Sequence, residues 1–415
     1  MRRYGPVARV LMVVALLLHA FLLLSVTTQS RPVVWALHND MVHRQGPAAD
    51  FFSIYHASAS LSDGRSPYSF EDDGRTPYFF PYRYMPIVAQ MGRLMLWIPP
   101  MAAYHSWVIL LEVMLVVLII LVWRVLTGWR RVFGVCCLLL STPYFLEVYM
   151  GQFTFATTAL LAFSLVSSAC LVYVLAVLLK MYPLAAGVAF VRTRRWKCFA
   201  LAAVALGLLT IPYFATHLDD LRAFRALNLK VPAGVAGGLH SGNYGFAYLL
   251  YLLLKGSGLS PAWPAFTGIL HVFLLGATAV VVFMSRDKRL VVGACAMVLA
   301  HFAGYAQVWE HHYSGVIVLG VLLLSQWRDG SRLVPVTVAA LVLMALPTPF
   351  ALFDVARDPA VWDPSTDWSL GASVAVVIPK ALPLFALYVA SMVPLLAAGV
   401  RSPREALRSL GRETA

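Results

Sequence analysis

The chain has 415 residues, of which 60% are hydrophobic and only 12% are charged, and its mean hydropathy is +0.76. A soluble domain carries about a quarter of its residues charged, so this composition excludes a soluble enzyme. Long apolar runs, rather than short segments of alternating polarity, favour an all-α polytopic membrane protein over an outer-membrane barrel. The formal net charge of +13 would suit nucleic acid, but its distribution along the chain does not.

Apolar runs between charged or turn-forming residues predict about twelve transmembrane helices in one integral membrane domain spanning residues 1–415. The predicted spans are 6–27, 103–124, 133–150, 153–167, 169–180, 182–192, 196–213, 262–284, 290–308, 312–327, 333–347 and 374–399. Those between Phe153 and Val191 are short for a bilayer core of about 30 Å and should be bent or partial. Residues 84–100 carry Arg93 and end in two prolines, which indicates a juxtamembrane or re-entrant helix.

The first apolar run, Tyr4 to Val26, is too long for a removable signal peptide and lacks a small-residue cleavage site, so we interpret it as a retained helix. The five cysteines lie in or beside apolar runs and lack the spacing of a metal site. They are therefore predicted to be small buried hydrophobic residues.

The charge distribution predicts an orientation. With the N-terminus inside, the inner segments hold nineteen lysines and arginines against four acids, which is the bias that the positive-inside rule describes. We therefore expect a multi-pass protein of the cell inner (plasma) membrane with both termini cytoplasmic and with its working surface outside. The large outer segments are then 28–102, which carries juxtamembrane helices, 214–261 and 348–373, with a short turn at 309–313.

Asp50 opens a segment with helical spacing, followed by Phe51, Ile54, Tyr55 and Ser58. Its carboxylate either caps a short amphipathic helix on the membrane surface or serves as a general base at the boundary between lipid and water. The hexapeptide that follows occurs twice, as Asp63–Tyr68 (DGRSPY) and Asp73–Tyr78 (DGRTPY), and its composition predicts tandem turns.

Three further polar groups stand at predicted outer boundaries. Arg83, in YRYMP, either snorkels to lipid headgroups or meets an anionic substrate. Gln152, in YMGQF, lies at a turn between two spans, where Gly151 suits a tight corner. Lys180, in LLKMYP, either snorkels or provides a cation for a lipid phosphate.

Two outer motifs complete the set. The glycine-rich GGLHSGNYG is either a linker or a sugar-contacting loop that uses His240 and Asn243. In WEHHYSG, the run Glu310-His311-His312 is denser in polar groups than an interfacial aromatic belt requires. Zinc is a poor interpretation, because adjacent helical histidines point about 100° apart and no second ligand motif accompanies them.

The order of these motifs over residues 45–320 resembles that of the membrane-embedded C-type glycosyltransferases that use polyprenyl-phosphate sugars. More narrowly, it is similar to the alpha-mannosyltransferase family that includes the mycobacterial phosphatidylinositol-mannoside enzyme. The resemblance implies Asp50 as the catalytic residue, His312 or failing that His311 near the donor phosphate, and a donor tail lying between helices. It matches Lys180 to the family's lysine and implies mannose as the sugar, with arabinose or glucose left open.

These residues suit transfer of a sugar from a polyprenyl-phosphate donor to a glycolipid or lipid-linked glycan acceptor, within a membrane of lipids. Asp50 would deprotonate the acceptor and invert the anomeric centre, while cationic or hydrogen-bonding groups stabilise the phosphate. The donor-phosphate candidates are His312, His311, Lys180 and Arg83. The acceptor or sugar candidates are Tyr55, Gln152, His240, Asn243 and Glu310.

Two alternatives stay open at this stage. A hydrolase would need two carboxylates that bracket the bond, and Asp50 with the distant Glu310 is the only suggestive pair. A transporter or flippase would place ionisable groups at mid-bilayer and show repeated halves, whereas the charges here lie at the outer boundary. No carboxylates cluster around Asp50, so neither a metal nor another cofactor is expected.

Overall fold

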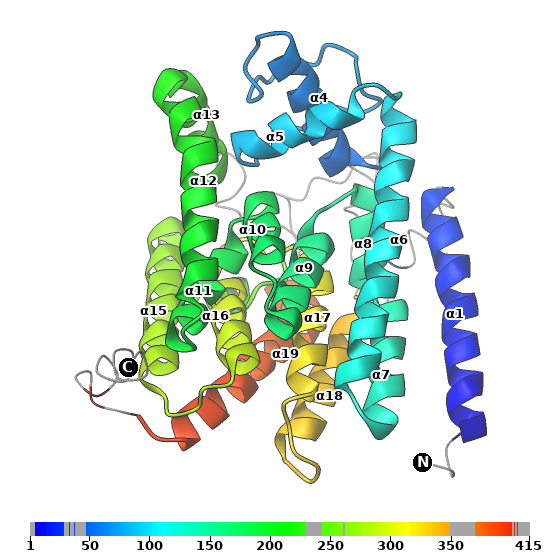
Figure 1. Ribbon diagram of the computed structural model, residues 1–415, viewed down its shortest axis with the longest axis vertical. Helices are drawn as coiled ribbons and strands as arrows, with labels where there is room; N and C mark the ends of the chain where they lie inside the picture. Colours follow the sequence, from blue (N-terminus) through cyan, green and yellow to red (C-terminus); the bar gives the residue numbers. More distant parts are fainter. Residues whose placement is uncertain are drawn as a thin grey trace.

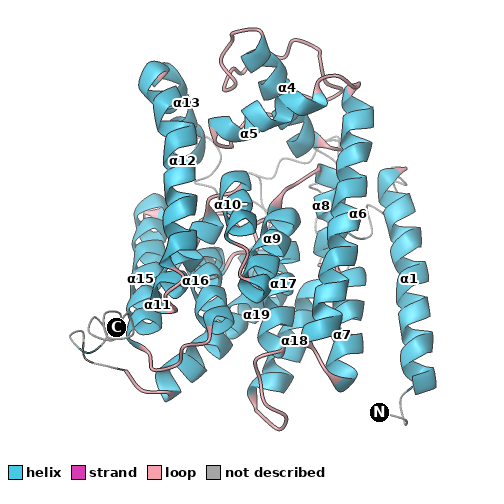
Figure 2. Cartoon of the chain, viewed as in Figure 1, coloured by secondary structure: helices cyan, strands magenta, loops and turns pink. Residues whose placement is uncertain are grey.

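The computed structural model describes residues 5–28, 47–229, 243–259, 262–348 and 370–400, with 33, 37, 402 and 405, and there the chain is helical (Figure 2). The helices are α1 (Gly5–Thr27), α4 (Ala49–Ser62), α5 (Pro86–Gly92), η1 (Arg93–Met95), α6 (Pro100–Val125), α7 (Gly128–Leu139), α8 (Thr142–Met150), α9 (Thr154–Ser167), α10 (Cys170–Leu179), η2 (Tyr182–Ala186), α11 (Gly187–Arg192), α12 (Trp196–Thr216), α13 (Leu218–Leu229), α14 (Phe246–Gly256), α15 (Trp263–Met284), α16 (Leu290–Gly304), α17 (His312–Leu324), α18 (Leu333–Ala345) and α19 (Leu370–Ala397). The all-α class and most of the expected helix positions agree with the sequence pattern.

The expectation of about twelve spans is not confirmed. Six helical stretches are long and apolar enough to cross a membrane, and the other six apolar helices of the described chain have only 10–17 residues. At about 1.5 Å per residue, such helices reach about 15–26 Å, which is less than a bilayer core of about 30 Å. The predicted span at 182–192 is instead the 3-10 turn η2 followed by the six-residue α11.

The short helices α4, α5 and α13 lie at one end of the long helices (Figure 1). The long helices α1, α6 and α12 run in roughly the same direction, and α4 and α5 lie between the upper ends of α6 and α12 in this view. The start of α1 lies at the lower end, away from α4. Residues 84–100, predicted as a juxtamembrane or re-entrant helix, form α5 and η1 in this upper layer.

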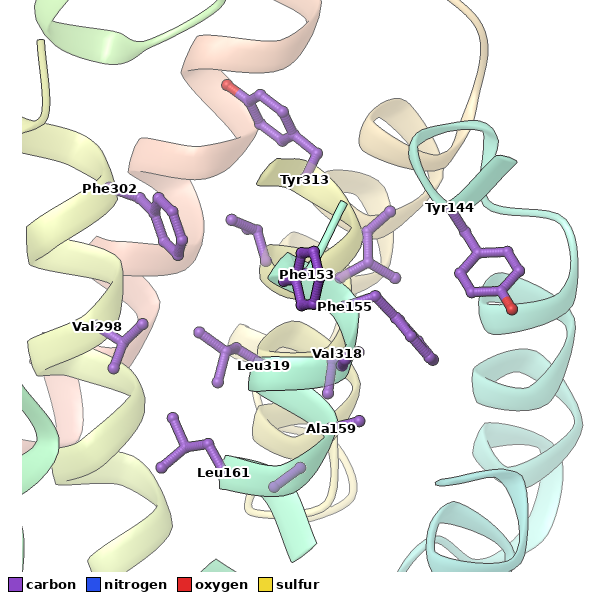
Figure 3. Packing of buried hydrophobic residues seen from close by; sticks show 14 of the residues in the cluster. Tyr144, Phe153, Phe155, Ala159, Leu161, Val298, Phe302, Tyr313, Val318 and Leu319 are labelled. Carbon is purple, nitrogen blue, oxygen red and sulfur yellow. The ribbon is translucent and has the colours of Figure 1, made fainter. Parts of the chain in front are cut away.

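The buried core is centred on α17. From Tyr313 to Leu324 every residue of this helix is buried, and it packs against α9, α8, α16 and α18. Figure 3 shows the contact, with Phe155 and Ala159 of α9 facing Val318 and Leu319 of α17. A Cβ at Gly315 would lie 2.4 Å from the Thr158 hydroxyl oxygen, so glycine allows the close approach of α17 and α9.

The cysteine prediction needs one correction. Cys170, at the start of α10, and Cys198, in the first turn of α12, form a disulfide. Their separation of 28 residues in the sequence gave no sign of this pairing, because it depends on the packing of the start of α10 against the start of α12. Cys137 and Cys295 are free and buried, as predicted.

The two DGR hexapeptides turn the chain as predicted, with Gly64 and Gly74 at φ +73° and +70°, and they bind each other. Arg65 of the first copy lies 2.6 Å from Asp73 of the second, and Arg75 reciprocally bridges Asp63. His56 of α4 also reaches Asp73, at 3.0 Å. The repeat therefore forms a reciprocal ion-pair cluster that fastens this loop to α4.

Candidate active site

The site begins where α4 meets the turn between α8 and α9. The backbone N–H of Ala48 donates to the carbonyl of Tyr149 across 2.6 Å, and Ala48 rather than Asp50 is the N-cap residue, with no side-chain cap bond. Asp50 is therefore not the helix cap that one interpretation of the sequence allowed. Its side chain lies in the first turn of α4 and the residue is only 7% exposed.

Gly151 makes this junction possible. It sits at φ +66°, and a Cβ there would lie 2.4 Å from the Cβ of Phe51. Side-chain-bearing residues disfavour that backbone conformation, and the contact leaves no room for a methyl group. The glycine thus brings the next residue, Gln152, alongside Asp50, which precedes Phe51.

Gln152 connects the acid to the neighbouring cation. Its amide oxygen accepts hydrogen bonds from the Tyr84 hydroxyl at 3.1 Å and the Lys180 ammonium at 2.9 Å. The oxygen also accepts the Phe153 N–H at 3.3 Å. The side chain hydrogen-bonds Asp50 as well, and because the oxygen is engaged by three donors, the amide nitrogen must be the donor to the carboxyl. Lys180 additionally donates to the Thr154 hydroxyl at 2.7 Å.

Burial raises the pKa of Asp50 to about 6, although the hydrogen bond from Gln152 and the charges of Lys180 and Arg83 oppose that change. A carboxyl group that titrates near neutral pH is a better proton acceptor than an ordinary aspartate. Arg83 is exposed, and its guanidinium lies over the ring of Phe80, 5.7 Å from the ring centroid.

His311 and His312 lie at the start of α17, with ring centroids 4.3 Å apart, and both interact electrostatically with Lys180. The backbone N–H of Trp309 donates to His312 Nδ1 at 2.9 Å. A neutral His312 therefore carries its proton on Nε2 and can donate it in a hydrogen bond. Buried His311 Nδ1 has no hydrogen-bond partner within the described chain.

Two predicted sugar contacts have other partners in the structure. Buried Glu310 lies 3.6 Å from Lys380 of α19 and accepts a hydrogen bond from Thr348. Asn243 is fully buried, donates to the Ala306 carbonyl and accepts from the Val308 N–H. The geometry favours these two residues as supports of the segment that carries His311, rather than as contacts to a sugar.

The remaining predicted contacts are more distant or undescribed. The Tyr55 hydroxyl donates to the Ile98 carbonyl at 2.9 Å. Its side chain lines a shallow cavity of about 360 Å³ with Arg75 and Leu96, on a different side of α4 from Asp50. His240 lies outside the described residues.

Sequence reasoning missed two buried charged residues, one beside Lys180 and one that pairs with Glu310. Glu147, near the end of α8, is fully buried beside Lys180 and Ser314, and Lys380 is a fully buried lysine within an apolar helix. Each is an isolated charged residue within an apolar run of the sequence, and this pattern could have indicated a functional or paired group. Within the described residues no group of three or more His, Cys, Asp or Glu side chains could hold a metal ion.

The fold and the site together define a helical membrane protein with an acid–base cluster where its helices meet a layer of crosswise helices. The chain belongs to glycosyltransferase family 87, whose model matches residues 82–304, more than half of the sequence. The protein is therefore a membrane glycosyltransferase. The match includes Arg83, Gln152 and Lys180, whereas Asp50 precedes it and His312 follows it. No curated protein and no solved structure matches the chain.

The junction at Gly151 can be tested with Gly151→Ala. We expect transfer activity to fall at least tenfold, because the added methyl must displace Phe51 and with it the neighbouring Asp50. Gly64→Ala is the matched control, since Gly64 has a similar φ of +73° and no atom within 4 Å of an added Cβ. The Gly64→Ala variant also places an alanine at positive φ, which costs about 1–2 kcal/mol of conformational free energy, and it should keep its transfer activity. Equal losses in both variants would contradict the packing argument.

The pair formed by Glu310 and Lys380 can be tested with a double-mutant cycle. Lys380→Met leaves a buried carboxylate without its partner and should lower the free energy of unfolding by about 3–5 kcal/mol. Adding Glu310→Gln removes that charge and should recover most of the loss, as measured by melting of the purified protein. Additive losses would show that the two groups are not coupled.

Proposed function

We propose that the protein transfers a sugar, most directly mannose, from a polyprenyl-phosphate donor to a glycolipid or lipid-linked glycan acceptor. The observation that carries the proposal is the cluster around Gln152, in which a buried carboxyl of raised pKa stands beside a lysine and an exposed arginine. A sugar transfer from a lipid phosphate needs both a base and anion-stabilising groups. Family membership supports the reaction class.

In the proposed reaction, Asp50 accepts the proton of the acceptor hydroxyl while the hydroxyl oxygen attacks the anomeric carbon of the donor. The bond between that carbon and the phosphate oxygen breaks, and the bonding electron pair leaves with the polyprenyl phosphate. A single displacement inverts the anomeric centre, so a β-linked donor gives an α-linked product. The leaving phosphate is already a weak base, so a second carboxylic acid is not required.

The phosphate would be held by groups that face the same cluster as Asp50. His312 offers an Nε2 proton, since its Nδ1 accepts from the backbone. Lys180 and Arg83 provide positive charge near Asp50, and His311 lies against His312. Gln152 would orient Asp50, and Tyr55 remains a proposed acceptor contact at the outer part of α4.

The proposed place of the reaction is the extracytoplasmic face of the inner membrane. The excess of lysine and arginine in the segments opposite the Asp50 layer supports this orientation. Nucleotide sugars are scarce outside the cytoplasm, which favours a lipid-linked donor. A site at the bilayer boundary would allow the donor tail to stay among lipids while its sugar reaches Asp50.

The direct test uses purified protein in liposomes without an ion gradient, synthetic short-chain polyprenyl-phosphate mannose and a panel of mannosylated lipid acceptors. Asp50→Asn keeps the shape of the side chain but removes the base, and we expect the transfer rate to fall about 10²–10⁴-fold. Because an active base must be ionised and the pKa of Asp50 is about 6, wild-type activity should decline as the pH falls below that value. Product mass measures both effects.

Asp63→Asn provides a matched control, because it makes the same chemical change at an exposed residue just past the end of α4. It should retain wild-type transfer. Full activity of folded Asp50→Asn would contradict the assignment of the base. No transfer from any lipid-linked donor would contradict the proposed reaction and favour the transporter or flippase alternative.

A further inference from the structure

A second carboxylate lies beneath the proposed site and has no role in the reaction described above. Glu147 of α8 is fully buried, and one of its carboxylate oxygens accepts the backbone N–H of Phe155 at 2.5 Å. The other oxygen accepts the Ser314 hydroxyl, also at 2.5 Å. Glu147 therefore ties the first turns of α9 and α17 to α8, and both of its partners donate to the ionised form of a carboxyl group.

Lys180 and Glu147 meet at the first turn of α9, where Lys180 donates to the Thr154 hydroxyl at 2.7 Å and the N–H of the next residue, Phe155, donates to Glu147. The ammonium of Lys180 donates to two neutral oxygens, those of Gln152 and Thr154, and its two stabilising charges are Glu147 and Asp50. A charged ammonium removed from water requires a counter-charge. If Asp50 were the only one, Lys180 would lose it at the step in which Asp50 accepts the acceptor proton.

We propose that Glu147 is a positioning residue that keeps Lys180 charged and oriented toward the donor phosphate throughout the transfer. Its two hydrogen-bond donors and the nearby Lys180 ammonium all favour the ionised carboxylate. Glu147 is thereby the counter-charge left to Lys180 when Asp50 has accepted the acceptor proton. The inference rests on the proposed function, because it assigns Lys180 to the phosphate.

The other charged and titratable groups around this pair lie on α8 itself and on four neighbouring segments. They are Tyr144 on α8, Asp50 on α4, Tyr84 before α5, Tyr182 in η2, and His311 and His312 at the start of α17. The tyrosines are neutral near pH 7, and both histidines sit close to the Lys180 charge, which disfavours a second positive charge there. Among these groups, Asp50 is the other anion that can balance Lys180.

The test measures the binding of polyprenyl monophosphate to purified protein as a function of pH. This compound is the donor without its sugar and is the leaving group of the proposed reaction. Compared with wild type, Glu147→Gln should weaken binding about ten- to a hundredfold, because the phosphate would lose a charge-assisted contact from Lys180 whenever the lysine is neutral. The weakening should grow as the pH rises above neutral, where an uncompensated lysine loses its proton. Donor KM in the transfer assay should rise in parallel.

The double variant Glu147→Gln/Lys180→Arg separates charge from structure. A guanidinium stays protonated without a counter-charge, so the double variant should lose the steep alkaline weakening and bind within a fewfold of Lys180→Arg alone. Ser314→Ala is the matched control, because it removes a hydrogen bond to Glu147 but leaves the carboxylate. It should show a smaller and pH-independent effect.

The outcomes distinguish the two proposals. If wild type does not bind polyprenyl monophosphate, the proposed donor is wrong. If wild type binds it and Glu147→Gln binds equally well with the same pH dependence, the role of Glu147 is wrong while the donor stands. A loss in folded Glu147→Gln that Lys180→Arg does not relieve would also overturn the inference, since it would mark Glu147 as a structural residue.

Discussion

The contact between the start of α4 and the turn from α8 to α9 is the constraint on which the site depends. Gly151 at φ +66° presses against Phe51, and the hydrogen bond from Ala48 to Tyr149 fixes the register of the two segments. Asp50 precedes Phe51 and Gln152 follows Gly151, so this contact necessarily places the acid beside the amide. Lys180, at the end of α10, then completes the cluster through Gln152.

The charges of the site explain why uncharged hydrogen-bond donors, as well as cations, would be needed to hold a phosphate there. Asp50 and Glu147 face Lys180 and Arg83, so the formal charges of these four groups cancel when all are ionised. In the proposed reaction, a lipid phosphate would therefore meet no net positive charge and would depend on directed hydrogen-bond donors as well as on local fields. His312 suits that need because its Nδ1 is engaged by the Trp309 N–H, which leaves the Nε2 proton for a ligand.

The sequence indicated the class of the fold and part of the site, because both leave local signals. Long apolar runs located most helices, and Gln152 and Lys180 stood out as polar groups at the ends of such runs. The number of spans stays a prediction, since hydropathy does not reveal whether a short helix crosses the bilayer. The Cys170–Cys198 bond and the pairing of Glu310 with Lys380 depend on which helices pack together, and periodicity carries no such information. The side chain of Asn243 hydrogen-bonds the backbone of Ala306 and Val308, and the sequence gave no sign of these contacts.

The central claim is that one carboxylate in this cluster drives a direct displacement at the sugar. The configuration of the product tests it most directly, using a polyprenyl-phosphate mannose of defined β configuration and nuclear magnetic resonance of the purified glycolipid. Our account predicts an α-linked product, because a single attack from the face opposite the phosphate inverts the anomeric carbon. A β-linked product would contradict it, since retention requires two successive displacements and a second nucleophile.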